Sequence, residues 1–122
     1  MKHTIKLMLA LTTAAAVHGV AMAAPDGERL FRVQCKGCHL ADGTGPGPSL
    51  NGVFGAKIGA RPNFAYSPAL AGKKDDSWTE ANLGAWLAGT DSFAPGTSMP
   101  TPQGLLTPAD RAAVVQYLKT LK

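Results

Sequence analysis

Two cysteines and a histidine form the most reactive group of side chains in the sequence. Cys35, Cys38 and His39 make the pattern C-x-x-C-H, and the chain of 122 residues has no other cysteine. Two thiols three residues apart, near one turn of helix, can reach the two vinyl groups on one edge of a porphyrin. The imidazole that follows can then point at the iron. This spacing indicates covalent attachment of one haem c.

Other uses of a C-x-x-C-H pattern fit the sequence less well. A thioredoxin-type redox pair belongs beside a βαβ unit, and no segment here predicts a strand. A structural zinc site takes four protein ligands, whereas this motif offers three. A disulfide between Cys35 and Cys38 would close a very short loop and contribute little stability. A chance occurrence of the pattern in a helical chain is the remaining alternative.

The N-terminal segment is typical of a secretory signal peptide. Lys2 and Lys6 flank the start, an apolar stretch covers residues 7–17, and Ala21-Met22-Ala23 forms a small-residue cleavage pattern. We expect cleavage after Ala23, so that residues 1–23 are the signal peptide and residues 24–122 are the mature domain in the periplasm. The alternative is an uncleaved membrane anchor, but the stretch is shorter than the ~20 apolar residues of a bilayer span.

Cleavage would leave a small and weakly charged chain. About 99 residues are few for a self-sufficient hydrophobic core, so a large buried cofactor would stabilise the fold. Loss of Lys2 and Lys6 lowers the formal net charge of +4 by two. Nothing in this charge indicates a nucleic-acid-binding surface.

The mature chain would retain one histidine and one methionine. His3 and His18 lie in the expected signal peptide, so a second histidine ligand from this chain is excluded. Met99 is likewise the only methionine left, and it lies in a constrained Pro/Gly loop over residues 95–100. We predict His39 and Met99 as the axial ligands of the iron. The alternatives are that Met99 fills a gap in the core, or that the sixth position is open.

This ligand pair predicts electron transfer rather than catalysis. A thioether raises the reduction potential relative to a second imidazole because it favours ferrous iron. Both axial positions are then filled, so small substrates cannot reach the metal. The single histidine is committed, and Asp75-Asp76 beside Lys73-Lys74 has the composition of a solvated loop. We therefore predict a single-electron carrier and no enzyme.

Three segments with helical periodicity are separated by Gly/Pro-rich sequence. Asp26 is a suitable N-cap for the first, which we expect to end around Cys38-His39 with Phe31 and Cys35 on one face. No segment of the sequence predicts a strand. The predicted class is therefore all-α.

The second helix is predicted from a capping box. Ser77 and Glu80, three residues apart, can each satisfy a backbone N–H at a helix start. We expect this helix to stop near Gly89. Its apolar residues fall on one face: Leu83, Trp86 and Leu87.

The third helix has the clearest start signals. Thr107 is a suitable N-cap, Pro108 takes the first helical position, and Asp110 lies in the first turn. Apolar residues then follow at helical spacing: Val114, Tyr117, Leu118 and Leu121.

The segments between the helices are long loops. Residues 40–74 are predicted as loop with one short helical turn near residues 67–71, and residues 91–104 as a second loop. Loops longer than about 12–15 residues are unusual in compact domains unless something organises them. A buried porphyrin would do so. The expected architecture is three main helices and long Gly/Pro-rich loops wrapped around one covalently attached haem.

Over residues 27–121 the sequence resembles the class I cytochromes c, the mitochondrial and bacterial c2-like monohaem proteins. Gly27 and Phe31 match the pattern that precedes the haem motif. Further matching segments follow along the chain: Gly47-Pro48-x-Leu50-x-Gly52-x-Phe54-Gly55, Phe64-Ala65-Tyr66-Ser67, Trp78, Pro95-Gly96-Thr97-x-Met99 and Tyr117-Leu118-Lys119.

The resemblance implies cofactor contacts that spacing alone does not. The Pro48 carbonyl is expected to accept a hydrogen bond from the His39 ring, which would orient the ring and increase its basicity. Tyr66 and Trp78 would hydrogen-bond a buried haem propionate, with help from Thr97. Without the resemblance, Tyr66 and Trp78 could equally be ordinary packing residues.

Some positions depart from the family pattern. Trp86 stands where the mitochondrial proteins carry a tyrosine that bonds to the methionine ligand, which puts that contact in doubt. Ala56 stands where an arginine often supports a propionate, and Arg61 could replace it. The loop between residues 39 and 48 is also shorter. Gly27 follows the pattern and implies that the first helix crosses close to the last.

The resemblance further implies a monomeric shuttle that meets its redox partner proteins at the exposed haem edge, with no nucleic acid involved. Lys36, Lys57, Lys73 and Lys74 could surround that edge and attract an acidic partner, or they could be scattered solubility charges. One alternative is a haem c subunit or dedicated electron acceptor of a specific oxidoreductase. Another is an enzyme with open iron, such as a weak peroxidase.

Overall fold

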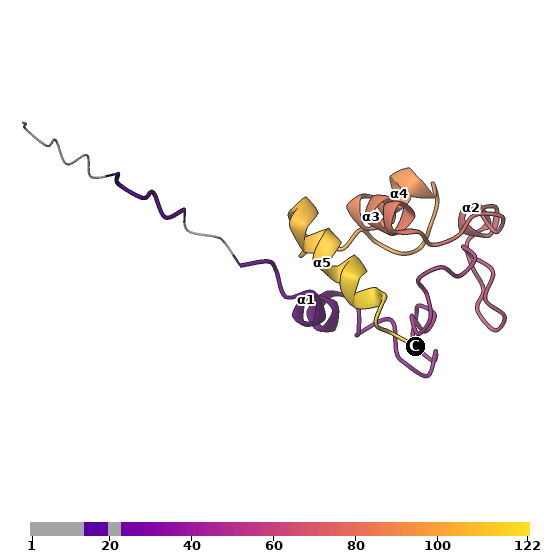
Figure 1. Ribbon diagram of the computed structural model, residues 1–122. Helices are drawn as coiled ribbons and strands as arrows, with labels where there is room; N and C mark the ends of the chain where they lie inside the picture. Colours follow the sequence, from indigo (N-terminus) through magenta and orange to yellow (C-terminus); the bar gives the residue numbers. More distant parts are fainter. Residues whose placement is uncertain (1–13, 20–22) are drawn as a thin grey trace, which may run out of the picture.

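The computed structural model describes residues 14–19 and 23–122, so residues 1–13 and 20–22 of the predicted signal peptide lie outside the described residues. Five helices follow in chain order: α1 (Gly27–Gln34), α2 (Pro68–Ala71), α3 (Glu80–Ala88), α4 (Thr90–Phe93) and α5 (Pro108–Leu118). The described residues contain no strand, only one isolated β-bridge between Lys57 and Ser77. The predicted all-α class with long loops is confirmed (Figure 1).

α1 and α5 cross each other at one end of the domain (Figure 1). Gly27 permits the crossing, because a Cβ at this position would lie 2.1 Å from the Ala113 carbonyl oxygen. Phe31 of α1 packs on Tyr117 of α5, with ring centroids 5.1 Å apart. Such aromatic pairs add ~0.5–1.5 kcal/mol to what their burial contributes. The close crossing implied at Gly27 is therefore present.

Gly27→Ala should lower the free energy of unfolding by about 1–3 kcal/mol, because the added methyl group forces two backbones apart. Gly84→Ala is the matched control inside α3, where no heavy atom of another described segment lies within 4 Å of the place that the methyl group would take. Alanine there should stabilise the helix by ~0.5–1 kcal/mol. Denaturant unfolding of the holoprotein measures both variants. Similar changes in the free energy of unfolding of the two variants would contradict the close crossing of α1 and α5.

α1 ends at Gln34, earlier than the predicted end around Cys38-His39. Cys35 is its C-cap, and the Cys35 N–H still bonds to the Phe31 carbonyl (2.8 Å). The Cys38 and His39 N–H groups then both bond to the Cys35 carbonyl, at 3.1 and 3.0 Å. The Lys36 N–H also bonds to the Phe31 carbonyl, five residues back (3.1 Å), and this bond breaks the i→i−4 pattern and ends the helix. The C-x-x-C-H motif therefore forms tight turns rather than helix.

The N-cap of α3 is Thr79, so the predicted Ser77–Glu80 capping box is wrong. The Thr79 Oγ1 accepts the Asn82 N–H at 3.1 Å. Ser77 lies two residues upstream, where it forms the β-bridge with Lys57. A cap must immediately precede the first helical residue, and the bridge holds Ser77 away from that position.

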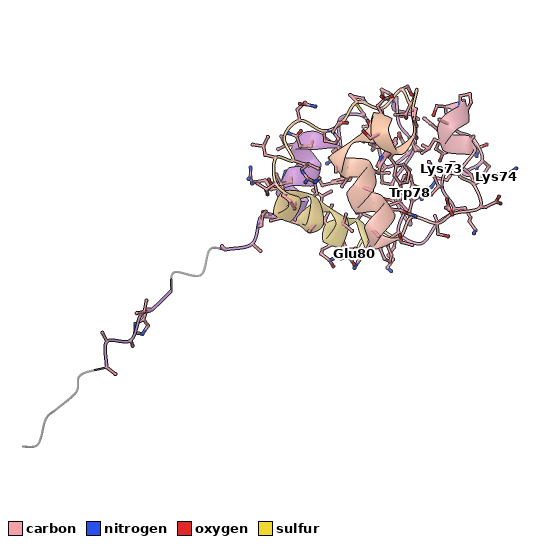
Figure 2. All side chains as sticks on the ribbon, turned by 90° about the horizontal axis from the view of Figure 1, so that it is seen from above. Lys73, Lys74, Trp78 and Glu80 are labelled. Carbon is pink, nitrogen blue, oxygen red and sulfur yellow. The ribbon has the colours of Figure 1, made fainter. Side chains whose placement is uncertain are left out.

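The Glu80 side chain joins α3 to α5 instead of capping its own helix. Its carboxylate accepts hydrogen bonds from the Gln116 amide (3.0 Å) and the Lys119 ammonium (2.6 Å). Figure 2 shows Glu80 at the end of α3 that meets α5. These contacts lower the pKa of Glu80, with the Lys119 hydrogen bond as the largest cause.

α5 begins as predicted. The Thr107 Oγ1 accepts the Asp110 N–H (3.1 Å), and the Asp110 carboxylate accepts the Thr107 N–H (2.9 Å). Pro108 takes the first helical position, where its missing N–H costs nothing. The predicted apolar face is buried at Val114 and Leu118.

Of the predictions for the two short helices, the structure confirms one and contradicts the other. α2 confirms the predicted turn near residues 67–71, with Ser67 as its N-cap. α4 contradicts the predicted loop, because the Gly89 and Thr90 carbonyls accept the N–H groups of Phe93 (3.0 Å) and Ala94 (2.9 Å). A single turn is too short to show helical periodicity in a sequence. No periodic pattern could therefore have indicated it.

The hydrophobic core draws on loops as well as helices. Val53, Ile58 and Leu105 are buried although each lies in a loop. Several core residues face an internal cavity, which the long loops help to enclose. Among the described residues, no helix combines the length and apolarity that a bilayer crossing requires.

Candidate cofactor site

A cavity of about 620 Å³ lies between the helices and the long loops. Its wall includes residues of α3 and α5, the turns after α1, and the loops on both sides of α2 and after α4. The structure brings all of the predicted cofactor-binding residues to this one cavity: Cys35, Cys38, His39, Pro48, Tyr66, Trp78, Thr97 and Met99. Residues far apart in the sequence thus share one site.

The His39 ring is held in one tautomer. Its Nδ1 lies 2.8 Å from the Pro48 carbonyl oxygen. A carbonyl can only accept, so Nδ1 carries the proton and Nε2 keeps its lone pair for a metal. Burial lowers the pKa of the imidazole, and the bond to Pro48 opposes this effect. The His39 ring is therefore neutral and oriented, with the Nε2 lone pair available to bind a metal.

The backbone of the Gly/Pro-rich loop packs directly on this ring. A Cβ at Gly47 would lie 2.5 Å from the His39 Cε1, and the Gly47 N–H bonds to the Cys38 carbonyl at 3.0 Å. A Cβ at Gly45 would lie 2.3 Å from the same carbonyl oxygen. The glycines of this loop therefore let it close over the haem motif.

The two cysteines lie in different environments. Cys35 is buried, whereas Cys38 is exposed. Burial raises the pKa of Cys35 to about 11, with a smaller contribution from Cys38. A protonated, buried thiol is a poor nucleophile, which disfavours the thioredoxin-type alternative.

Met99 reaches the cavity from the loop that follows α4. Its side chain is partly buried and packs against the hydrophobic core. Its backbone carbonyl accepts a hydrogen bond from the Thr90 hydroxyl at 2.7 Å. The thioether adds a soft sulfur donor to the cavity, of the kind that suits iron in a low oxidation state.

Three aromatic rings pack against one another at the cavity. Trp78 stacks on Phe93 at 5.7 Å between centroids, and Trp86 contacts both rings, at 5.7 and 5.8 Å. Trp78 and Trp86 are buried and line the cavity. Trp86 therefore contributes to the apolar wall at the position where the mitochondrial proteins carry a tyrosine.

Polar side chains also line the cavity. The Arg61 guanidinium donates to the Asn51 carbonyl, and the Lys57 ammonium donates to the Asp75 carbonyl at 2.9 Å. Burial raises the pKa of Tyr66 against the opposing charge of Arg61, so its hydroxyl remains a donor. From the sequence, Lys57 is among the lysines that could surround the haem edge or be scattered solubility charges, and its position in the cavity wall agrees with the first of these.

The cavity suits a haem in size and in chemistry. Its volume of about 620 Å³ lies within the ~300–1,000 Å³ typical of ligand sites. The apolar wall matches a porphyrin ring, and the neutral imidazole and the thioether match its iron. The guanidinium and ammonium groups match its carboxylates. The residues present therefore fit the group that the motif indicates.

Known proteins resemble this chain in sequence and in structure. The family model described as cytochrome c matches residues 24–122. Cytochrome c2 iso-1 of Magnetospirillum molischianum is 46% identical over 94 residues, which is 73% of this chain and 91% of the relative. Cytochrome c of Sesamum indicum is 39% identical over 98 residues, covering 76% of this chain and 85% of the relative. The structure of cytochrome cH from Methylobacterium extorquens matches with a TM-score of 0.70 at 40% identity, covering 78% of this chain and 95% of that one.

The family match and these relatives agree with the cavity and its haem motif. Family members are electron carriers rather than enzymes, and each haem c is held through the cysteines of a C-x-x-C-H motif. The chain belongs to the cytochrome c family and is a monohaem electron carrier, with its haem c attached through Cys35 and Cys38.

Proposed function

We propose that this cytochrome works in the periplasm and that its iron is ligated by His39 and Met99. The observation that carries the proposal is that these two side chains line the same cavity as Cys35 and Cys38. They are also the only histidine and the only methionine of residues 24–122, the proposed mature domain.

Each ligand residue has a distinct task. The haem, when bound, supplies one-electron exchange between ferric and ferrous iron. His39 offers Nε2 in an orientation maintained by its 2.8 Å bond to the Pro48 carbonyl. Met99 offers a soft sulfur, which favours the ferrous state. Ligation of the iron by both residues would leave no coordination site for a substrate.

The remaining site residues hold and shield the group. Tyr66, Trp78 and Thr97 would donate to the haem propionates, and Arg61 would pair with their charge. The aromatic wall around Trp78 excludes water, which strengthens these polar contacts. These assignments rest on the cavity lining and on the family resemblance.

Spectroscopy and redox titration of the purified holoprotein test the ligand assignment. We expect a single one-electron transition and the weak ferric absorption band near the red end of the spectrum that marks methionine–iron coordination. A ferric protein without this band at neutral pH would contradict ligation by Met99. Ready binding of carbon monoxide by the ferrous protein would instead support the open-iron alternative.

Export would follow from cleavage of residues 1–23. The charged start, the apolar stretch and the small residues before Ala24 support this, and the family match begins at residue 24. We expect the mature protein in the periplasmic fraction with Ala24 as its first residue by mass spectrometry. Ala23→Asp should block processing, since cleavage requires a small residue there. Recovery of the wild-type chain with its first 23 residues intact would contradict the proposal.

The proposed carrier is a monomer that meets separate donor and acceptor proteins. Lys73 and Lys74 lie together at the end of the domain that carries α2 (Figure 2). Their charge would attract acidic partners, so electron transfer should slow as ionic strength rises. A stoichiometric complex that survives purification from the native host would favour a dedicated subunit of one oxidoreductase instead.

A further inference from the structure

Thr90 is the one buried polar residue among those the structure describes, with 1% of its surface exposed. It is the first residue of α4 and precedes the methionine loop, by which we mean residues 94–101. Its hydroxyl donates to the Met99 carbonyl at 2.7 Å, and its N–H donates to the Thr101 hydroxyl at 3.0 Å. Thr90 therefore contacts the backbone of the proposed ligand itself.

The proton positions in this network follow from its geometry. The two threonine hydroxyls lie 3.1 Å apart, and either could donate to the other. Because the Thr90 hydroxyl proton is used at the Met99 carbonyl, the Thr101 hydroxyl must donate to Thr90. Each group then donates once, and the network is satisfied without water. Such buried, closed networks specify one arrangement of the chain.

A second contact ties the other end of the methionine loop to α4. The Asp91 carboxylate accepts the Gly96 N–H at 2.9 Å, and the Thr97 N–H bonds to the Ala94 carbonyl at 3.0 Å. The loop therefore leaves α4, turns at Gly96 and returns to α4 at Met99. A single helical turn holds both ends of the segment that carries the sulfur.

We propose that Thr90 is a positioning residue that holds Met99 on the iron against competing ligands. The inference rests on the proposed function, because it requires Met99 to be the axial ligand. Fixing the Met99 carbonyl restricts the backbone from which the thioether extends, so fewer conformers place the sulfur away from the metal. Removal of the Thr90 hydroxyl would leave the Met99 carbonyl without this hydrogen bond. Since the site is buried, water cannot replace the bond without cost.

Competition with imidazole tests this proposal on the ferric holoprotein. Added imidazole displaces the methionine from the iron, and the titration is monitored by the loss of the methionine–iron band. We expect Thr90→Val, which keeps the shape and removes the hydroxyl, to bind imidazole about tenfold more tightly (~1.4 kcal/mol). Thr90→Ser retains the donor and should stay near the wild-type affinity.

Thr120→Val is the matched control. The Thr120 hydroxyl also donates to a backbone carbonyl, that of Tyr117 at 2.6 Å, but it lies beyond the end of α5. This variant also loses a hydroxyl-to-carbonyl bond, at an exposed position away from the cavity, and should bind imidazole like the wild type. A Thr90→Val affinity within about twofold of the control would overturn the positioning role, even if Thr90→Val lowers global stability.

The Met99→Ala background separates this inference from the ligand assignment. In that background Thr90→Val should have no further effect on imidazole affinity, because the group that it positions is gone. A further gain there would show that Thr90 acts elsewhere and would overturn the proposal. If Met99→Ala itself changed neither the band nor the affinity, the His/Met assignment would fail instead.

Thr101→Val keeps the test decisive if Thr90→Val does not fold. It removes the hydroxyl that accepts the Thr90 N–H and donates to the Thr90 hydroxyl. We expect tighter imidazole binding in this variant as well, because it opens the same network. An unchanged affinity in Thr101→Val would count against the proposal.

Discussion

Met99→Ala should abolish the ferric methionine–iron band and lower the reduction potential by on the order of 0.1–0.3 V, within the ~0.8 V that axial ligands can span. The thioether stabilises ferrous iron, whereas the water or hydroxide that replaces it stabilises ferric iron. The vacated position should also let the ferrous protein bind carbon monoxide. Redox titration and absorption spectroscopy of the holoprotein measure these changes together.

Met99→His separates the loss of the thioether from the opening of the site. A second imidazole should keep the potential low, as in Met99→Ala, but it should close the sixth position again. Carbon monoxide should then bind to the alanine variant and poorly to the histidine variant. A Met99→Ala protein with the wild-type band and potential would exclude Met99 as the ligand.

Removal of the haem should leave the chain without a stable fold. A cavity of about 620 Å³ would remain. Its largely apolar wall would then be exposed to water, which costs on the order of several kcal/mol against the ~5–15 kcal/mol stability of a typical domain. The double variant Cys35→Ser/Cys38→Ser, purified free of haem, should therefore lose most of its helical circular dichroism and its cooperative unfolding transition.

The single variant Cys38→Ser provides the control for this experiment. It keeps the buried Cys35 thiol, so one thioether can still hold the haem in the cavity. We expect this variant to remain folded with haem bound, though less stable than the wild type. A haem-free double variant that unfolds cooperatively with near-native helix content would show that the cavity closes on itself.

The cofactor and the type of chemistry could be predicted from short segments of the sequence. The C-x-x-C-H motif specifies haem attachment within five consecutive residues, because both sulfurs and the imidazole must reach one porphyrin. Met99 was predicted as a ligand by exclusion, since no other methionine remains after the expected cleavage. The start of α5 was also readable, because the Thr107–Asp110 capping box forms between residues three apart.

Besides the missed turn α4, the sequence prediction failed at two places, one because of contacts between distant segments and the other because of a local turn. Ser77 and Glu80 have the spacing of a capping box, but Lys57 pairs with the first and α5 binds the second. α1 was expected to end around Cys38-His39, yet the Lys36 N–H bonds five residues back to the Phe31 carbonyl and the helix ends at Gln34. In both places a helical preference was overridden by hydrogen bonds that the residue pattern does not contain.

Local chemistry along the chain thus predicted the haem attachment through Cys35 and Cys38, the proposed ligands His39 and Met99, and a helical fold. Assembly of the long loops decided how those groups meet: Pro48 orients His39, Gly47 lets the backbone pack on the ring, and Trp86 completes the apolar wall. It also placed the Thr90 hydroxyl on the Met99 carbonyl, a contact between residues nine apart in the sequence. Ligand identity depends on side-chain type, which a sequence records directly. Ligand placement depends on packing between loops that have no periodicity, and it exists only once the chain has folded.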